Sequence, residues 1–219
     1  STSKIKDIAH KYNTTITGLL ISLVIKSMED ILSIKEKKKP ISITVPIDLR
    51  KYYHSKTVRN FFNVTNIEYK FTKNNTPLEE IIKIVNKKLK ESLTEEAINA
   101  NMTKLIWLEH FFIIRLIPLF IKNKVMKYTY KLTRKKQTMG LSNVGKITLP
   151  SSCKAYVDKC MVINSTDVLE MCVISYEDEI CMSFSSHFIN SELEKNFFRL
   201  LKSYNLDIII YNNEIGGND

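Results

Sequence analysis

Apolar residues recur at helical spacing in several parts of the chain. Between Ile16 and Ile34 they form one broad stripe, which is typical of a helix buried against a sheet. Residues 3–12 are compatible with a shorter helix. Thr76 and Ser191 each precede an apolar periodic stretch, and each is followed three residues later by a glutamate, the pattern of a helix capping box. The sequence therefore predicts helices after both residues.

Met102–Val125 is more apolar than the helix predicted before it and approaches the length of a membrane span. Charged residues and Pro118 interrupt it, and no stretch contains the roughly eighteen uncharged residues that a spanning helix needs. We interpret it as two helices, or one helix kinked at Pro118, that is buried or lies on an interface.

Alternation of apolar and polar residues predicts strands elsewhere. The strand-like stretches are 41–45, 60–71, 155–163, 169–176, 180–188 and 206–211. Glu177–Glu179 is a polar turn between two of them and predicts a hairpin. The order of elements favours an α/β (α+β) fold in which helices pack on a mixed β-sheet. We assign residues 1–211 to a single unit and 212–219 to a flexible tail.

Gln137–Pro150 (QTMGLSNVGKITLP) contains two of only five glycines in the chain. Apolar residues flank the small polar pair Ser142 and Asn143, and Gly145 follows two residues later. This pattern indicates a strand interrupted by a bulge or a tight turn, because glycine allows backbone geometries that other residues avoid. Whether the interruption is only structural, or presents groups to a ligand, stays open at this point.

The chain carries a formal net charge of +10, which is compatible with anionic partners but names none of them. A run without acids follows the apolar stretch and includes Lys124, Lys127, Lys131, Arg134 and Lys135. It is interpreted as a solvated face, a contact for phosphates, or a membrane-surface contact. No nucleic-acid-binding motif accompanies the charge, so we expect no nucleic-acid partner.

The four cysteines are widely separated, and three of them lie in apolar runs, so we expect free thiols in a reducing compartment, no metal site and a cytoplasmic protein. His10, His54, His110 and His187 lack the spacing of a catalytic set, and His187 is the best of them as a candidate base. Asp48 and Arg50 are expected to pair and hold a loop. No phosphate-binding loop motif is present.

Several stretches, in order, resemble the C-terminal lobe of the superfamily of CoA-dependent acyltransferases and peptide-synthetase condensation domains. The alcohol acetyltransferase-like and wax-ester-synthase-like branches are the most similar. TTITGLLISLVIKSM resembles the helix that opens that lobe, ISITVPIDLR and RNFFNVTNIEY two of its strands, and LSNVG the strand beside the groove between lobes. VISYEDEICMSFSSHFINSELEKNFFRLL resembles its closing hairpin and helix, although Arg59 stands where the family usually has glycine.

The resemblance implies a two-lobe enzyme that transfers an acyl group from acyl-CoA, or another thioester, to an alcohol or similar acceptor. The family's catalytic histidine belongs to an H-H-x-x-x-D-G motif in the N-terminal lobe, which this chain lacks. The chain alone is then inactive and needs that lobe of the same polypeptide as its partner. Ser142, Asn143 and Gly145 are expected to face the acyl-donor groove, and the basic residues listed above to contact CoA phosphates or a membrane.

The sequence leaves a second interpretation open. The chain is then a non-catalytic binding or assembly module, either a degenerate acyltransferase lobe or a basic domain that docks peripherally on a membrane surface.

Overall fold

The computed structural model describes residues 1–112, 116–186 and 190–212. In this part of the chain, five strands form one mixed sheet in the order β2-β1-β3-β4-β5. The strands are β1 (Ile41–Asp48), β2 (Phe62–Tyr69), β3 (Met139–Ile147), β4 (Leu169–Tyr176) and β5 (Glu179–Ser185). β3 runs parallel to both β1 and β4, whereas β2 and β5 pair antiparallel at the two edges.

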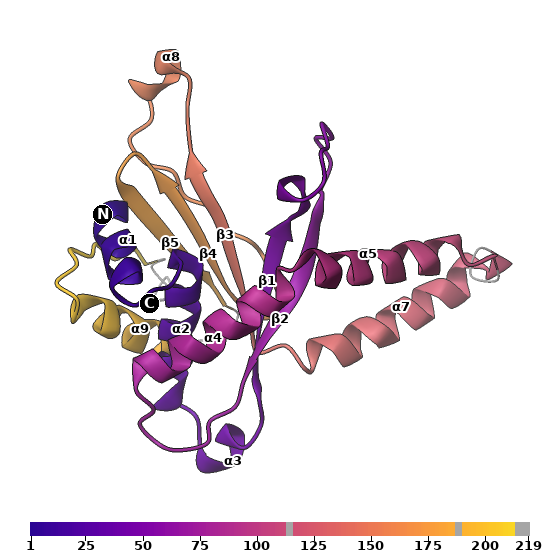
Figure 1. The fold of residues 1–219 in the computed structure, drawn as a ribbon, viewed down its shortest axis with the longest axis horizontal. Helices are drawn as coiled ribbons and strands as arrows, with labels where there is room; N and C mark the ends of the chain where they lie inside the picture. Colours follow the sequence, from indigo (N-terminus) through magenta and orange to yellow (C-terminus); the bar gives the residue numbers. More distant parts are fainter. Residues whose placement is uncertain (113–115, 187–189, 213–219) are drawn as a thin grey trace, which may run out of the picture.

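Helices cover one face of the sheet (Figure 1). They are α1 (Thr2–Lys11), α2 (Ile16–Glu29), α4 (Leu78–Ser92) and α9 (Glu192–Lys202), while the short helices α3 (Ile34–Lys37), η1 (Leu49–Lys51) and α8 (Ser151–Lys154) lie in connections. The α/β fold expected from the sequence, a mixed sheet with packed helices, is confirmed.

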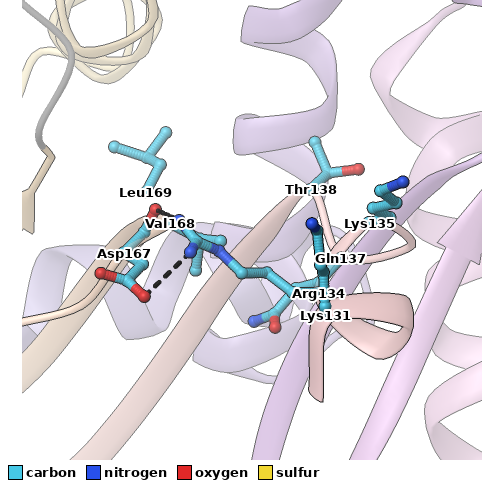
Figure 2. Close-up of a pocket in the computed structure, with 8 residues that line it drawn as sticks. All are labelled: Lys131, Arg134, Lys135, Gln137, Thr138, Asp167, Val168 and Leu169. Atoms are coloured by element: carbon cyan, nitrogen blue, oxygen red, sulfur yellow. Dashed lines mark hydrogen bonds and ion pairs between the residues drawn. The ribbon is translucent and has the colours of Figure 1, made fainter. Parts of the chain in front are cut away.

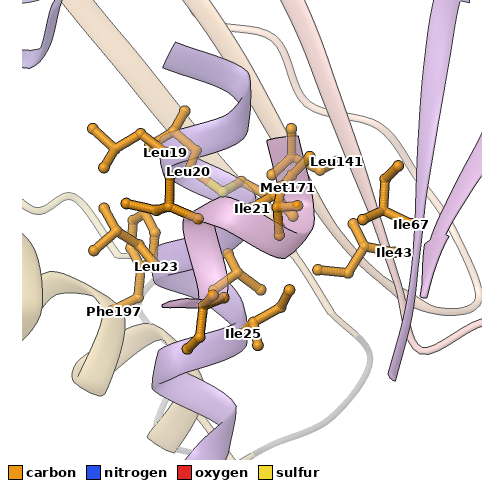
Figure 3. Packing of buried hydrophobic residues seen from close by; sticks show 14 of the residues in the cluster. Leu19, Leu20, Ile21, Leu23, Ile25, Ile43, Ile67, Leu141, Met171 and Phe197 are labelled. Atoms are coloured by element: carbon orange, nitrogen blue, oxygen red, sulfur yellow. The ribbon is translucent and has the colours of Figure 1, made fainter. Parts of the chain in front are cut away.

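α2 lies at the centre of the core and is buried almost all round. Leu20, Leu23 and Ile25 are fully buried between the sheet and the neighbouring helices (Figure 3). Two serines of α2 are also buried, and their hydroxyls donate to the carbonyl four residues earlier at 2.7 Å. Such bonds satisfy the hydroxyls inside the helix, so serine is tolerated in an otherwise apolar environment.

α5 (Glu95–His110) and α7 (Leu119–Arg134) form a helical arm that projects from the body beside β2 (Figure 1). Among the described residues of Met102–Val125, 102–110 belong to α5 and 119–125 to α7, with Pro118 as the residue before α7, where its fixed φ favours a helix start. The interpretation of this stretch as buried is wrong, because α7 contains no buried residue and Trp107 of α5 is exposed. No helix within the described residues combines the length and apolar character that crossing a bilayer would require.

Two predicted strands are wrong. Residues 155–163 and 206–211 have no strand pairing and form turns and extended segments instead. Many of their apolar residues are exposed, as at Tyr156 and Met161 in the first and Ile209 and Ile210 in the second, although Leu206 is buried in the core. A strand needs a neighbouring strand with unpaired backbone groups, and the alternation of apolar residues within a segment does not show whether such a neighbour exists. The predicted flexible tail falls almost entirely on residues 213–219, outside the described residues.

Both predicted capping boxes are also wrong. α4 and α9 have no side-chain cap hydrogen bond. At α4 the reason is visible, since Thr76 is buried and its backbone N–H donates to the carboxylate of Glu29 at 2.9 Å. A tertiary contact thus replaces the local one. The cysteines are free thiols, and Cys172 is buried as expected for a small apolar side chain.

Candidate functional site

A groove of about 1270 Å³ lies where β1 and β3 approach their carboxyl ends. Its walls come from the start of α2, the second half of α4, the end of β1 and the middle of β3. Several lining side chains are uncharged hydrogen-bonding groups, namely Asn13, Thr14, Thr17, Asn86 and Asn143. The groove therefore suits a ligand with amide, carbonyl or hydroxyl groups better than a simple hydrocarbon.

The β3 bulge gives the groove its shape on one side. The pairing of β3 with β4 shifts between Asn143 and Gly145, which leaves Val144 as an extra residue, and Gly145 has a φ of 89°. The Asn143 side-chain carbonyl accepts a hydrogen bond from the Gly145 N–H at 3.0 Å. The bulge predicted from the glycine pattern is thus confirmed, and Asn143 stabilises it.

Asn143 also points toward α2. Its side-chain amide donates to the Thr17 hydroxyl oxygen at 3.0 Å, so Asn143 links the strand to the first turn of the helix. The second N–H of the amide has no partner within the described residues. The two interpretations left open by the sequence are therefore compatible, because Asn143 supports the bulge with its oxygen and is also part of the groove lining.

Ser142 and Gly145 are placed differently from Asn143. Successive side chains of a strand point to opposite faces, so Asn143 shares the face of the buried Met139 and Leu141, and Ser142 points to the other face. Among the three residues selected from the sequence, only Asn143 is part of the groove lining. The sequence predicts that Ser142 and Asn143 share one groove, but the pleat of the strand directs their side chains to opposite faces of the sheet.

The positive φ of Gly145 leads to a stability prediction. A methyl group at this position would meet no atom within 4 Å, so the cost of Gly145→Ala comes from the backbone alone. We expect a loss of about 1 kcal/mol in the free energy of unfolding, measured by urea denaturation. Gly145→Asn is the control and should cost less, because asparagine adopts positive φ more readily. Equal costs for the two variants would contradict this explanation.

Two groove residues, Thr14 before α2 and Asn86 on α4, have no signal in the sequence. Thr14 donates to the Asn86 side-chain oxygen at 2.6 Å, and Asn86 donates to the Asn13 carbonyl at 3.2 Å. Gly18 permits this arrangement, since a Cβ there would lie only 2.4 Å from the Thr14 hydroxyl oxygen. In the sequence Thr14 has the character of a helix cap, and Asn86 lies in a lysine-rich helix with no motif around it, so neither gave a signal.

Among the described residues, His10 is the one histidine that lines the groove. His10 is exposed at its rim, His54 and His110 do not line it, and His187 lies outside the described residues. Asp48 lines the groove but pairs with Arg50 at 3.2 Å, as expected. In the described part of the chain, no group of three His, Cys, Asp or Glu side chains could hold a metal ion.

A separate basic pocket of about 380 Å³ lies before the start of β3 (Figure 2). Lys131, Arg134 and Lys135 line it, but Arg134 is already paired with Asp167, with 2.9 Å between nitrogen and carboxylate oxygen. Lys124 and Lys127 lie farther along α7 and are not part of this pocket. Of the five basic residues selected from the sequence, three therefore line the pocket, and Lys124 and Lys127 lie on the exposed surface of α7.

No protein-family model and no curated protein matches the sequence, whereas solved structures match the fold. TRI3 trichothecene 15-O-acetyltransferase from Fusarium sporotrichioides has a TM-score of 0.58 at 13% identity, over 93% of this chain and 45% of that one. A structure of condensation domain-mediated chain release from the enacyloxin polyketide synthase has a TM-score of 0.55 at 8% identity, and the match covers 97% of this chain and 41% of that one. The peptide synthetase FmoA3 has a TM-score of 0.60 at 13% identity, and the match covers 96% of this chain and 22% of that one.

The chain has the condensation-domain acyltransferase fold. It spans less than half the length of the chains it matches, as expected for one lobe of a larger protein. The segments that carry the sequence resemblance form α2, β1, β2, β3 and the β4–β5 hairpin with α9. The groove is therefore formed by three of those segments, α2, β1 and β3, together with α4.

Proposed function

We propose that this chain is the C-terminal lobe of an acyltransferase that moves an acyl group from CoA, or another thioester, to an alcohol or a related acceptor. The observation that carries the proposal is the bulge that turns the Asn143 amide into a groove of the condensation-domain fold. The structures with this fold include an acetyltransferase and condensation domains, which supports acyl transfer as the reaction class.

The reaction needs a base that this lobe does not supply. In the proposed step, the acceptor oxygen forms a bond to the thioester carbonyl carbon, and the C–S bond breaks. The acceptor proton passes to the histidine of an H-H-x-x-x-D-G motif in the N-terminal lobe and then to the departing thiolate.

The lobe's own groups would bind and orient the donor. The free N–H of Asn143 is suited to donate to a donor carbonyl, or to the oxygen that gains charge during attack. Thr17 holds that amide in place, which reduces the reorganisation needed on binding. In the basic pocket, Lys131 and Lys135 would attract phosphates of the donor, whereas Arg134 is already neutralised by Asp167.

Asn143→Ala tests the groove. In the complete polypeptide that includes this chain, we expect acyl transfer to fall about tenfold or more, with little change in the melting temperature. The measurement is thiol release from acetyl-CoA and longer acyl-CoAs with a panel of alcohols.

Asn66→Ala is the matched control. Asn66 accepts a hydrogen bond from Thr44 on the opposite face of the sheet, so its loss should leave turnover unchanged. Unchanged turnover in Asn143→Ala would remove Asn143 from the donor site. A complete reading frame without H-H-x-x-x-D-G, or without transfer from any thioester, would overturn the proposed function itself.

A further inference from the structure

The helical arm of α5 and α7 carries an unusual concentration of exposed apolar side chains. Of the 27 large hydrophobic residues that are exposed among those described, 13 lie between Ile106 and Leu132. Trp107 is 60% exposed, Phe112 70% and Phe120 65%, and α7 contains no buried residue. Apolar surface of this extent on a soluble domain indicates a binding surface.

The charge of the α7 half of the arm is one-sided, whereas α5 carries Glu95, Glu96 and Glu109 beside Lys104. From His110 to Lys136 the sequence has no aspartate or glutamate. Lys124, Lys127, Lys131 and Arg134 follow one another at spacings of three and four, so they form a stripe along one side of α7. Arg134 has an acidic partner in Asp167, whereas the three lysines have no acidic partner among the described residues.

We propose that this arm docks on an anionic lipid bilayer. Aromatic and aliphatic side chains would enter the boundary between headgroups and acyl chains, and the lysines beside them would contact anionic headgroups, as in interfacial amphipathic helices. Lysine stems cover apolar surface while their charged ends stay in water, which suits this mixed pattern. The proposal concerns a different surface from the groove, although Lys131 also lines the basic pocket, and it does not depend on the proposed function.

The pattern favours lipid over other occupants of the arm. The centre of a protein interface is depleted in lysine, whereas here lysines alternate with the apolar residues along α7. The phosphates of a nucleic acid would pair with the lysines, but a nucleic acid offers no apolar surface against which leucine, isoleucine and methionine side chains could pack. A bilayer with anionic lipids offers both an apolar interior and a negative surface.

Trp107 provides a direct measurement because it is the only tryptophan in the chain and lies on the arm. The experiment titrates the full chain with vesicles of phosphatidylcholine alone, or of phosphatidylcholine with 30 mol% phosphatidylserine. We expect the Trp107 emission to shift to shorter wavelength, and the protein to co-sediment, only with the anionic vesicles at low salt. High salt should release the protein, because exposed charges are then screened.

Two double variants separate the apolar contribution from the charge. Phe112→Ser with Phe120→Ser should abolish the emission shift, and Lys124→Gln with Lys127→Gln should weaken vesicle affinity about tenfold. These side chains are exposed, so circular dichroism should be unchanged. Lys6→Gln with Lys70→Gln is the matched control, since it removes two exposed lysines outside the arm and should bind like the wild type.

Three results would overturn the proposal. The first is no anionic-vesicle binding at low salt. The second is binding that does not change when Phe112 and Phe120 are replaced, since lipid would then act only as a polyanion. The third is concentration-dependent self-association through the arm, measured by light scattering, that vesicles do not compete with.

Discussion

Glu29→Ala is expected to lower the free energy of unfolding by about 3 kcal/mol. The Glu29 side chain is 2% exposed, and its carboxylate lies 2.7 Å from the Lys26 ammonium. The other carboxylate oxygen accepts the Thr76 N–H at the start of α4. Removing the carboxylate would leave a largely buried ammonium without its counter-ion and a buried N–H without its acceptor.

Lys26 limits the loss, because it also donates to the Asn75 side chain and the Thr76 carbonyl. Chemical denaturation followed by circular dichroism would measure the change. Glu91→Ala is the control, since its contact with Lys87 is 3.9 Å and both side chains are mostly exposed. That variant should lose less than about 0.5 kcal/mol. Similar losses in the two variants would show that the Glu29 site has no special role.

The same carboxylate makes stability depend on pH. Burial alone would raise the pKa of Glu29, but hydrogen bonds from Lys26 and Thr76, with the charges of Lys26 and Lys37, lower it overall. Its contribution is therefore present above the ordinary glutamate pKa and is lost as the pH falls through the lowered pKa. We expect the stability difference between wild type and Glu29→Gln to shrink as the pH falls from 5 toward 3. A difference that is constant over this range would contradict the assignment.

Glu29 also shows why the sequence predicted elements better than their connections. The Thr76-Pro77-Leu78-Glu79 stretch predicts a helix, and α4 is present, but the capping interaction is replaced by a contact with a residue 47 positions earlier. Spacing within a segment encodes periodicity and turn preference. It does not encode which distant group competes for a backbone N–H, and that competition decided this helix start.

The site shows the same limit. The glycine pattern around Asn143 predicted the bulge, because an unusual backbone requirement has a local signature. The partner of Asn143 could not be predicted, since Thr17 lies 126 residues away in the chain. The basic run is a similar case. One part of it lines a pocket with Asp167 and the other part lies on an exposed helix surface. This division depends on the packing of α7 against residues 167–169, which the sequence does not specify.

Leu23→Ala is expected to cost about 3 kcal/mol in unfolding free energy, because it would open a cavity at the centre of the core. Leu23 is fully buried on α2, which packs against α4 and α9 as well as the sheet (Figure 3). A void there has rigid walls on several sides, so the surrounding structure has little room to collapse into it.

Two companion variants make this prediction specific to the buried position. Leu23→Met nearly conserves the volume and should cost less than about 1.5 kcal/mol. Ile31→Ala removes a similar side chain just beyond α2, where the isoleucine is 40% exposed, and should also cost much less than Leu23→Ala. A Leu23→Ala loss no larger than that of Ile31→Ala would mean that α2 does not organise the core. α2 also carries Thr17, so the helix at the centre of the core also positions the partner of Asn143 in the groove.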